Sequence, residues 1–344
     1  MKAVLALTSR YICNIDNKTG EKPDSNTALQ YYYETLHYLQ NALKQSTAIY
    51  ANSEELLAIA MIISTYEMLS LSSSGDWNRH LKGIFWLQRS QEIHGASGGL
   101  RQAVWWLWLR QDLWAAFRER RKCYSFWVPT KPIEELDPSD LAGFPIYLLS
   151  QAVNYCAVDV QRNMSTGRDV DRGDLLADML SKWKSCLGPE YAPLPTARHG
   201  SSSVFQPIWI HPPTIASALQ VHSFATLLLT LHRPSVVSGF SAYRKTQKIL
   251  SDAVSTICGI AGMSSCCAKH QRLHELTEFV LEELKAEECQ IMSAQCLFGA
   301  GLCVEDNSKR DRIVTLIEAC EQRTGWPTTT LVSSLREEWN KVIE

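Results

Sequence analysis

Apolar side chains recur every three or four residues along most of the chain, which is the spacing of an amphipathic α-helix. The segment 28–43 shows the pattern well, with one apolar stripe formed by Leu29, Tyr32, Tyr33, Leu36, Leu39, Ala42 and Leu43. We expect this stripe to form a single buried face. The alternation of apolar and polar residues that marks half-buried strands has no convincing instance. The pattern therefore predicts an all-α protein.

The segment 56–69 is nearly all apolar, which is typical of a helix buried on every side. Ser53 precedes it as a predicted N-cap, and two glutamates follow in the first turn, near the positive end of the helix dipole. Asp76 is a similar N-cap for a helix that reaches Gln88. The same periodicity predicts further helices at 144–161, 174–186, 212–231, 243–261, 271–298, 308–324 and 328–342.

A tryptophan-rich segment follows the Gly98-Gly99 pair, with Trp105, Trp106, Trp108 and Trp114 within ten positions. Its apolar residues first cover more than one face and then narrow to one stripe, after which come Arg118, Arg120, Arg121 and Lys122. We interpret 105–122 as a core helix whose last turns emerge into solvent, where cations meet the negative end of the helix dipole. A nucleic-acid or nuclear-import patch is the alternative for the basic run.

The domain organisation predicted from this pattern is one large all-α unit over residues 1–344, built as a multi-helix domain of packed helical hairpins. At 187–212 the composition shifts to proline, serine and glycine, with the run Gly200-Ser201-Ser202-Ser203 near its centre. We expect a long loop or a soft boundary between subdomains there.

Charge and apolar run lengths exclude several classes of protein. With 34 basic and 36 acidic residues the net charge is -2, so nothing in the bulk charge draws the chain to DNA, RNA or an anionic membrane. The apolar runs 56–63 and 103–109 are far shorter than the ~18 to 20 residues that cross a bilayer, so no membrane anchor is expected. The short apolar run at the start predicts the first helix of the domain, and we expect an intracellular protein.

The eleven cysteines are spread along the chain and include no Cys-x-x-Cys, which favours reduced, mostly buried thiols. Cys266, His270 and His274 are spaced to share a helix face, but without a fourth ligand an ordinary loop is favoured over a zinc site. A second set, Cys289, Cys296 and Cys303, repeats every seven residues, which indicates core packing, with a thiol relay as the alternative. The sequence thus predicts no metal site.

A glycine-rich phosphate cradle does not occur, and we expect no catalytic residues and no enzyme. His80 and His94 are candidates to lie near Asp76 or Glu92, but a structural role is favoured for both histidines.

Several segments, taken in order, carry a resemblance to a known family. The first are 3–7 (AVLAL) with 28–32 (ALQYY), 56–69 with its YEM at 66–68, and 77–83 (WNRHLKG). The tryptophan-rich segment follows, with Arg110-Gln111-Asp112 as its most specific part. Downstream come 228–235 (LLTLHRPS), 257–261 (ICGIA), 294–301 (AQCLFGAG), 324–326 (TGW) and 335–339 (LREEW). Together they resemble the regulatory domain of fungal zinc binuclear cluster transcription factors, and Cys296 stands where that family usually has proline.

The resemblance implies an all-helical domain in a nuclear transcriptional regulator, often one that controls a metabolic gene cluster. It implies protein partners, as a homo- or heterodimer, and a candidate small-molecule effector. Family members normally carry a cysteine-rich module that folds around two zinc ions ahead of this domain. This chain starts within the regulatory domain, so zinc is expected only with an upstream module, and DNA contact only through such a module or indirectly.

Six positions are the candidate effector-binding or switch residues: Trp77, His80, Trp105, Trp108, Arg110 and Asp112. For Arg110 and Asp112 the structural alternative is a salt bridge or a hydrogen bond between helices. Two further functions stay open at this point. One is a scaffold or heterodimer partner of a full-length zinc-cluster factor without its own DNA binding, and the other is a pathway enzyme on a helical scaffold.

Overall fold

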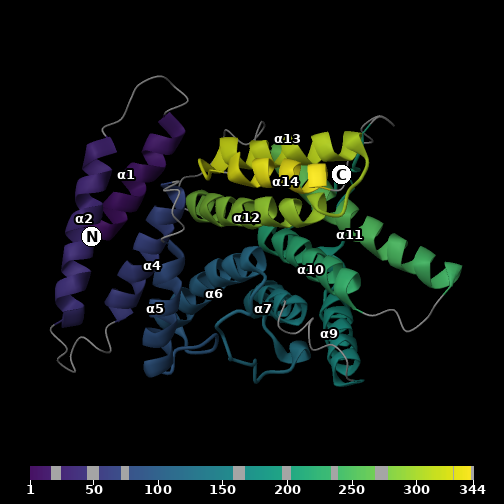
Figure 1. Ribbon diagram of the computed structural model, residues 1–344, viewed down its shortest axis with the longest axis horizontal. Helices are drawn as coiled ribbons and strands as arrows, with labels where there is room; N and C mark the ends of the chain where they lie inside the picture. Colours follow the sequence, from purple (N-terminus) through teal and green to yellow (C-terminus); the bar gives the residue numbers. More distant parts are fainter. Residues whose placement is uncertain are drawn as a thin grey trace. The chain divides into compact units, whose positions relative to one another are not determined.

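The computed structural model describes residues 1–16, 25–44, 54–70, 77–157, 167–195, 203–233, 239–267, 278–327 and 329–341, and within them it confirms the all-α prediction (Figure 1). The α-helices are α1 (Lys2–Asp16), α2 (Ser25–Lys44), α4 (Glu54–Leu69), α5 (Trp77–Ser90), α6 (Gly99–Glu119), α7 (Pro138–Cys156), α9 (Gly167–Ser185), α10 (Pro213–His232), α11 (Phe240–Cys267), α12 (Glu278–Gly301), α13 (Asn307–Thr324) and α14 (Thr329–Lys341). The β contact in these residues is an isolated antiparallel bridge, Leu194 with Trp209.

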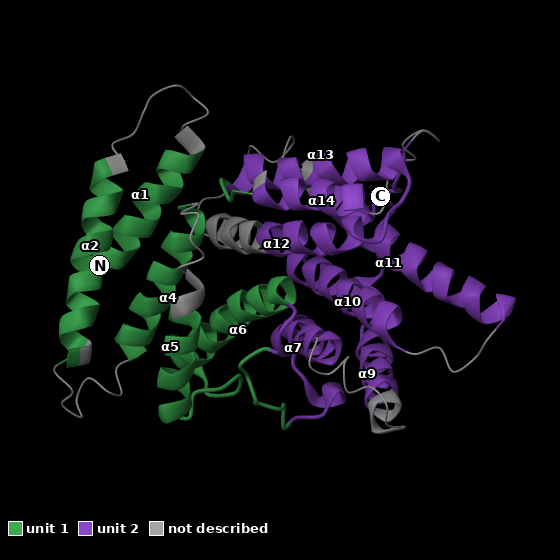
Figure 2. Cartoon of the chain, viewed as in Figure 1, with its two compact units in different colours: residues 1–119, 123–130, 325–327 green, residues 120–122, 131–324, 328–344 purple. Residues whose placement is uncertain are grey.

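The chain forms two compact units, shown in different colours in Figure 2. Unit 1 comprises residues 1–119, 123–130 and 325–327, and unit 2 comprises 120–122, 131–324 and 328–344. The segment 187–212, expected as a long loop or soft boundary, lies inside unit 2, where its described residues include the short 3₁₀ helix Pro189–Tyr191 and the Leu194–Trp209 bridge.

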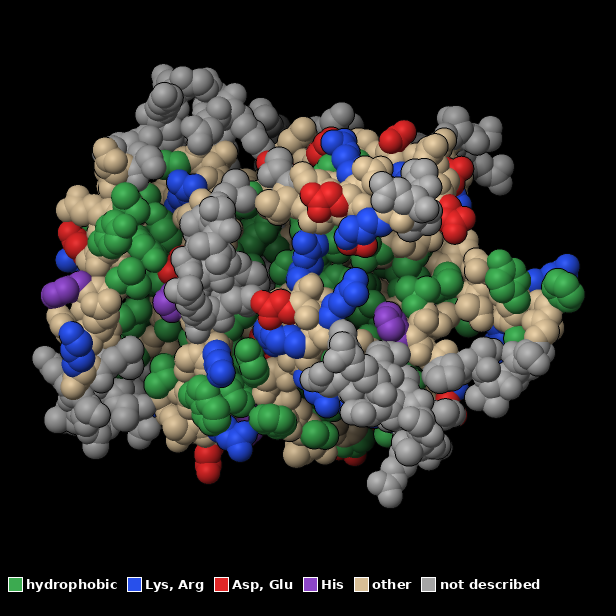
Figure 3. Space-filling model, viewed as in Figure 1, with side chains coloured by type: hydrophobic (Ala, Val, Ile, Leu, Met, Phe, Trp, Pro, Cys, Tyr) green, Lys and Arg blue, Asp and Glu red, His purple; other side chains and the backbone are tan. Residues whose placement is uncertain are grey.

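In unit 1, α1, α2 and α4 pack against one another around the buried residues Ala6, Ala28 and Tyr66. The buried face of α2 agrees with the predicted stripe only in part: Ala42 is buried, but Leu29 and Tyr33 are exposed, and Ala28 and Thr35 outside the stripe are buried instead. Alanines let neighbouring helices approach closely, so the helix turns its small residues inward. Figure 3 shows the resulting apolar side chains on the surface over α1 and α2.

The tryptophan-rich helix differs from its prediction at both ends. Helix α6 begins at Gly99, six residues before Trp105, directly after Gly98, whose φ of 78° favours glycine. It ends at Glu119 because Arg120 has a left-handed φ of 54°. The predicted basic helix end is therefore wrong, since Arg118 is the basic residue of the last turn and 120–122 follow the helix.

Unit 2 is organised around α10, which packs against α7, α9, α11 and α12. The residues of α10 are buried along most of its length. The Phe224 ring of α10 lies so close to Gly299 of α12 that a Cβ added at Gly299 would be 2.1 Å from the ring atom Cε2. By length and mean hydropathy α10 could span a membrane, but 67% of its most apolar window is buried inside the fold, as expected of a core helix.

The start of unit 2 shows how a cap extends a helix beyond its apolar pattern. Apolar spacing predicted a helix over 144–161, whereas α7 begins at Pro138 and ends at Cys156. The Asp137 side chain accepts hydrogen bonds from the backbone N–H groups of Ser139 and Asp140, and proline at the first helical position has no N–H to leave unpaired.

Candidate functional site

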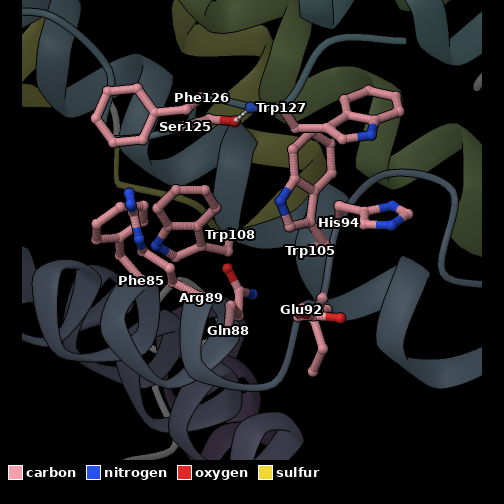
Figure 4. Close-up of a pocket in the computed structure, with 11 residues that line it drawn as sticks. Phe85, Gln88, Arg89, Glu92, His94, Trp105, Trp108, Ser125, Phe126 and Trp127 are labelled. Atoms are coloured by element: carbon pink, nitrogen blue, oxygen red, sulfur yellow. Dashed lines mark hydrogen bonds between the residues drawn. The ribbon is translucent and has the colours of Figure 1, made fainter. Parts of the chain in front are cut away.

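A cavity of about 260 Å³ lies within unit 1, where α5, the turn after it, α6 and the segment 123–130 come together (Figure 4). Most of its lining is aromatic or apolar: Phe85, Ile93, Trp105, Trp108, Phe126 and Trp127. The polar and charged lining residues are Gln88, Arg89, Glu92, His94 and Ser125. We call this cavity the aromatic pocket.

The aromatic rings of the pocket contact one another at defined angles. Trp105 and Trp127 meet edge to face, with ring centroids 4.9 Å apart. Phe85 stacks on Trp108 at 5.8 Å. Such contacts add to the stabilisation from apolar burial and hold large rings in fixed orientations. The walls therefore present rigid ring faces and edges rather than flexible chains.

Hydrogen bonds from two indole groups, that of the lining residue Trp108 and that of Trp106 beside the pocket, tie α6 to the backbone of the preceding elements. Trp108 Nε1 donates to the Leu81 carbonyl oxygen at 2.9 Å, which joins α6 to α5. Trp106 Nε1 donates to the Gly95 carbonyl oxygen at 3.2 Å, which joins α6 to the turn. A Cβ on Gly95 would lie 2.7 Å from Trp127 and 2.8 Å from Trp105, so this position has no room for a side chain. The turn after α5 is thus fitted closely against the pocket.

Asp112 holds the third segment of the pocket. Its carboxylate is completely buried, and Oδ2 accepts a 2.7 Å hydrogen bond from the Tyr124 backbone N–H. This bond ties α6 to the segment 123–130, which contributes Phe126 and Trp127 to the wall. Asp112 therefore acts on the pocket by positioning its wall.

Gln88 is the buried polar group of the pocket. It is 2% exposed, and neither its Nε2 nor its Oε1 has a hydrogen-bond partner in the structure described here. In Figure 4 its amide lies between Trp105 and Trp108. Gln111 of α6, also buried, is satisfied instead: it accepts from Ser64 Oγ at 2.8 Å and donates to Thr65 Oγ1 at 3.0 Å. The lack of hydrogen bonds is therefore specific to the pocket residue Gln88 and is not shared by the buried Gln111.

Charged residues lie at the rim of the pocket. The Arg89 guanidinium lies 5.3 Å from the centroid of the Phe126 ring, which is 74% exposed. Glu92 is exposed and has a left-handed φ of 54°. The His94 ring stacks on Trp127, and its Nδ1 accepts from the Ala96 backbone N–H at 3.1 Å, which places the proton of the neutral ring on Nε2.

His80 belongs to a second polar cluster, formed where α2, α4 and α5 meet. Glu67 Oε1 accepts from the Tyr32 hydroxyl at 2.7 Å and lies 3.1 Å from His80 Nε2. Burial and the hydrogen bond to Glu67 raise the pKa of Tyr32. Of the neighbours expected for His80, Asp76 lies outside the described residues, and Glu67 is a partner that the sequence did not indicate. The cluster joins three helices by their side chains, which is a structural role.

The six predicted positions therefore separate in space. Trp105 and Trp108 line the pocket, Asp112 positions its wall, and His80 lies in the Glu67 cluster. Arg110 is half-buried on α6, and Trp77 begins α5 with its side chain outside the described part. Of the other pocket residues, His94 and Glu92 were named from the sequence, whereas Phe85, Gln88, Phe126 and Trp127 were not. The available signals were a helix break at Gly98-Gly99 and a second aromatic pair, Phe126-Trp127, just after the helix.

The described cysteines are free thiols. Burial raises the pKa of Cys296, and it raises the pKa of Cys303 to about 11, so both remain protonated thiols at neutral pH. Packing, rather than a thiol relay, fits these two groups. In the cluster 266–274, residues 268–274 and the side chain of Cys266 lie outside the described residues. Among the described residues no group of three or more His, Cys, Asp or Glu could hold a metal ion.

Comparison with known proteins confirms the resemblance. Residues 1–100, which include α5 and the turn of the pocket, match the family model described as the fungal specific transcription factor domain. The chain is also similar to the transcription activator AMTR1 of Alternaria alternata, with 22% identity over 366 residues that cover 87% of this chain and 46% of that protein. The chain thus spans about half the length of this curated relative. No solved structure matches the chain.

Proposed function

We propose, from the fungal specific transcription factor domain in residues 1–100, that this chain is the regulatory part of a nuclear transcriptional regulator and is not an enzyme. The observation that carries the proposal is this family match, together with the similarity of 87% of the chain to a transcription activator. The regulated genes belong to a metabolic gene cluster, as the resemblance implies for many members of the family.

In mechanism, the helical domain changes the population of two states when it binds an effector or a protein partner. A ligand shifts such an equilibrium only by its difference in affinity for the two states. The aromatic pocket supports this mechanism because three successive segments of the chain form its walls, so an occupant contacts all three together. The partners are proteins, in a homo- or heterodimer, and contact with DNA is made through them or through a zinc-cluster module.

The experiment joins the chain to an unrelated DNA-binding domain and measures a reporter gene in fungal cells. We expect reporter output to rise or fall relative to the DNA-binding domain alone. Gly299→Ala, which disrupts the α10–α12 contact in unit 2, should abolish the effect, while Gly83→Ala, at a helical position with nothing within 4 Å of the added Cβ, should retain it. A fusion that is folded, nuclear and without effect on the reporter would overturn the proposal.

A further inference from the structure

We propose that the aromatic pocket binds a neutral, planar molecule of one or two rings that carries a hydrogen-bond donor and an acceptor side by side, as in a cyclic lactam or a primary amide. This inference rests on the proposed regulatory function only for its biological meaning, since the binding itself is a property of unit 1. The argument has three steps: the shape of the pocket, the unpaired amide of Gln88, and the charge of the rim.

The shape of the pocket selects a flat aromatic occupant. Its walls are ring faces and edges held in place by the Trp108 indole hydrogen bond and by the edge-to-face contact of Trp105 with Trp127. Flat rings make the same stacked and edge-to-face contacts with such walls that the walls make with each other. The volume of about 260 Å³ lies just below the roughly 300–1,000 Å³ of sites for drug-sized ligands, which limits the occupant to one or two rings.

The Gln88 side chain selects the polar group of that occupant. A primary amide carries two N–H donors and a carbonyl acceptor, and both polar atoms of this one lack partners in the structure described here. Leaving a buried amide without hydrogen bonds is costly, so a molecule that satisfies both atoms gains more than one that satisfies either alone. A lactam or a primary amide presents the complementary N–H and C=O side by side, and so can form two parallel bonds with the Gln88 amide.

The charge of the rim favours a neutral molecule. The charged residues of the lining are Arg89, which is exposed and lies over Phe126, and Glu92, which is also exposed. With one cation and one anion, both facing water, the rim offers no net charge to an ion. The buried wall has Gln88 but no ionic partner, and an ion without one is expensive to bury.

The test measures binding of 2-quinolone, a two-ring lactam, to the purified chain by isothermal titration calorimetry. N-methyl-2-quinolone lacks the N–H donor, and naphthalene lacks both polar groups. We expect 2-quinolone to bind about tenfold more tightly than N-methyl-2-quinolone, the difference that one well-made hydrogen bond to a buried group provides. Equal affinities for these two probes, or no binding of 2-quinolone, would overturn the proposal.

Variants locate the binding at Gln88. Gln88→Met keeps the unbranched shape of the side chain and removes both polar atoms, so it should weaken 2-quinolone binding about tenfold and leave naphthalene binding unchanged or tighter. Gln30→Met, at an exposed position of α2 in the same unit, is the matched control and should bind as the unchanged chain does. Unchanged 2-quinolone affinity in Gln88→Met would place the probe elsewhere and overturn the inference.

The two proposals fail separately. Absence of probe binding together with an active reporter fusion would overturn the ligand inference and leave the regulator. Probe binding together with an inactive reporter fusion would overturn the regulator and leave the site.

Discussion

The aromatic pocket of unit 1 and the α10 core of unit 2 each bury a glutamine, and both residues are 2% exposed. Gln220 on α10 donates from Nε2 to the Ile257 carbonyl oxygen and to Ser293 Oγ, each at 2.9 Å. Gln88 makes no side-chain hydrogen bond within the described structure. The same residue type at the same depth is therefore a structural link in one unit and an unsatisfied group facing a cavity in the other.

The difference shows how to separate structural from binding polar groups when burial alone does not. A hydrogen-bonded amide contributes roughly 1 kcal/mol to stability, whereas a buried amide without partners costs about 1–3 kcal/mol. In unit 2 the polar groups described above stabilise the contacts between helices. In unit 1 the unpaired Gln88 amide lowers the stability of the fold, and a bound molecule that forms hydrogen bonds with it can remove this destabilisation. The amide lies beside rings that are otherwise closely packed.

The largest expected effect is the acid sensitivity of unit 2. Burial lowers the pKa of His222 to about 4, while an unfolded histidine titrates near 6.5. Between these pH values the unfolded chain takes up a proton that the folded chain does not, so stability falls as the pH decreases. We expect a loss of about 3 kcal/mol between pH 7 and pH 4, measured by urea denaturation across that range. His222→Gln should flatten the dependence, and a pH profile identical in that variant would contradict the assignment.

A second test compares packing density at two glycines. Gly299→Ala places a Cβ 2.1 Å from the Phe224 ring, so α12 and α10 must move apart, at a cost of about 2.5 kcal/mol. Gly83→Ala on α5 has nothing within 4 Å of the new Cβ, and should stabilise that helix by about 0.5 kcal/mol. Thermal unfolding monitored by circular dichroism measures both. Equal effects at the two sites would show that the close contact in unit 2 is readily relaxed.

Asp112 tests how the wall of the pocket is held. Asp112→Ala removes the acceptor for the Tyr124 N–H, and we expect the free energy of unfolding to fall by about 2 kcal/mol. Asp112→Asn keeps an acceptor oxygen and should recover much of this loss. If Asp112→Ala unfolds at the same denaturant concentration as the unchanged chain but no longer binds 2-quinolone, then Asp112 contacts the ligand directly instead of positioning the wall.

The two buried glutamines give the most direct comparison of the two units. Gln220→Met removes two hydrogen bonds and should destabilise the chain by about 1.5 kcal/mol, while Gln88→Met removes unpaired polar atoms and should stabilise it by about 1 kcal/mol. We predict that the two variants change the free energy of unfolding, measured by urea denaturation, in opposite directions. Destabilisation by both variants would show that the Gln88 amide is satisfied in solution.

Much of the helical framework could be predicted from the sequence, because apolar spacing is a local signal. The segment 212–231 was predicted as a helix, and α10 differs from it by one residue at each end. The buried face of α2 could not be predicted in the same way, since hydrophobicity does not distinguish a stripe of large residues from the adjacent stripe of small ones. There the close approach of neighbouring helices selected Ala28 and Thr35 over Leu29 and Tyr33.

The pocket was predictable only in part. Trp105 and Trp108 were candidates because tryptophans are concentrated there, and both line the cavity. Gln88 resembles any polar residue of an amphipathic helix, and its significance depends on where the segment 123–130 returns after α6. That return is fixed by Asp112 and by a left-handed residue at Arg120, which local periodicity does not reveal.

The division of unit 1 along the chain has a consequence for biosynthesis. Its last piece, residues 325–327, follows almost the whole of unit 2, and the Asn14 side-chain amide donates to the Gly325 carbonyl oxygen at 3.4 Å. A nascent chain that has emerged only as far as residue 130 holds all of the pocket residues but lacks this closing contact. Unit 1 is therefore completed after most of unit 2 has left the ribosome, although its helices are translated first.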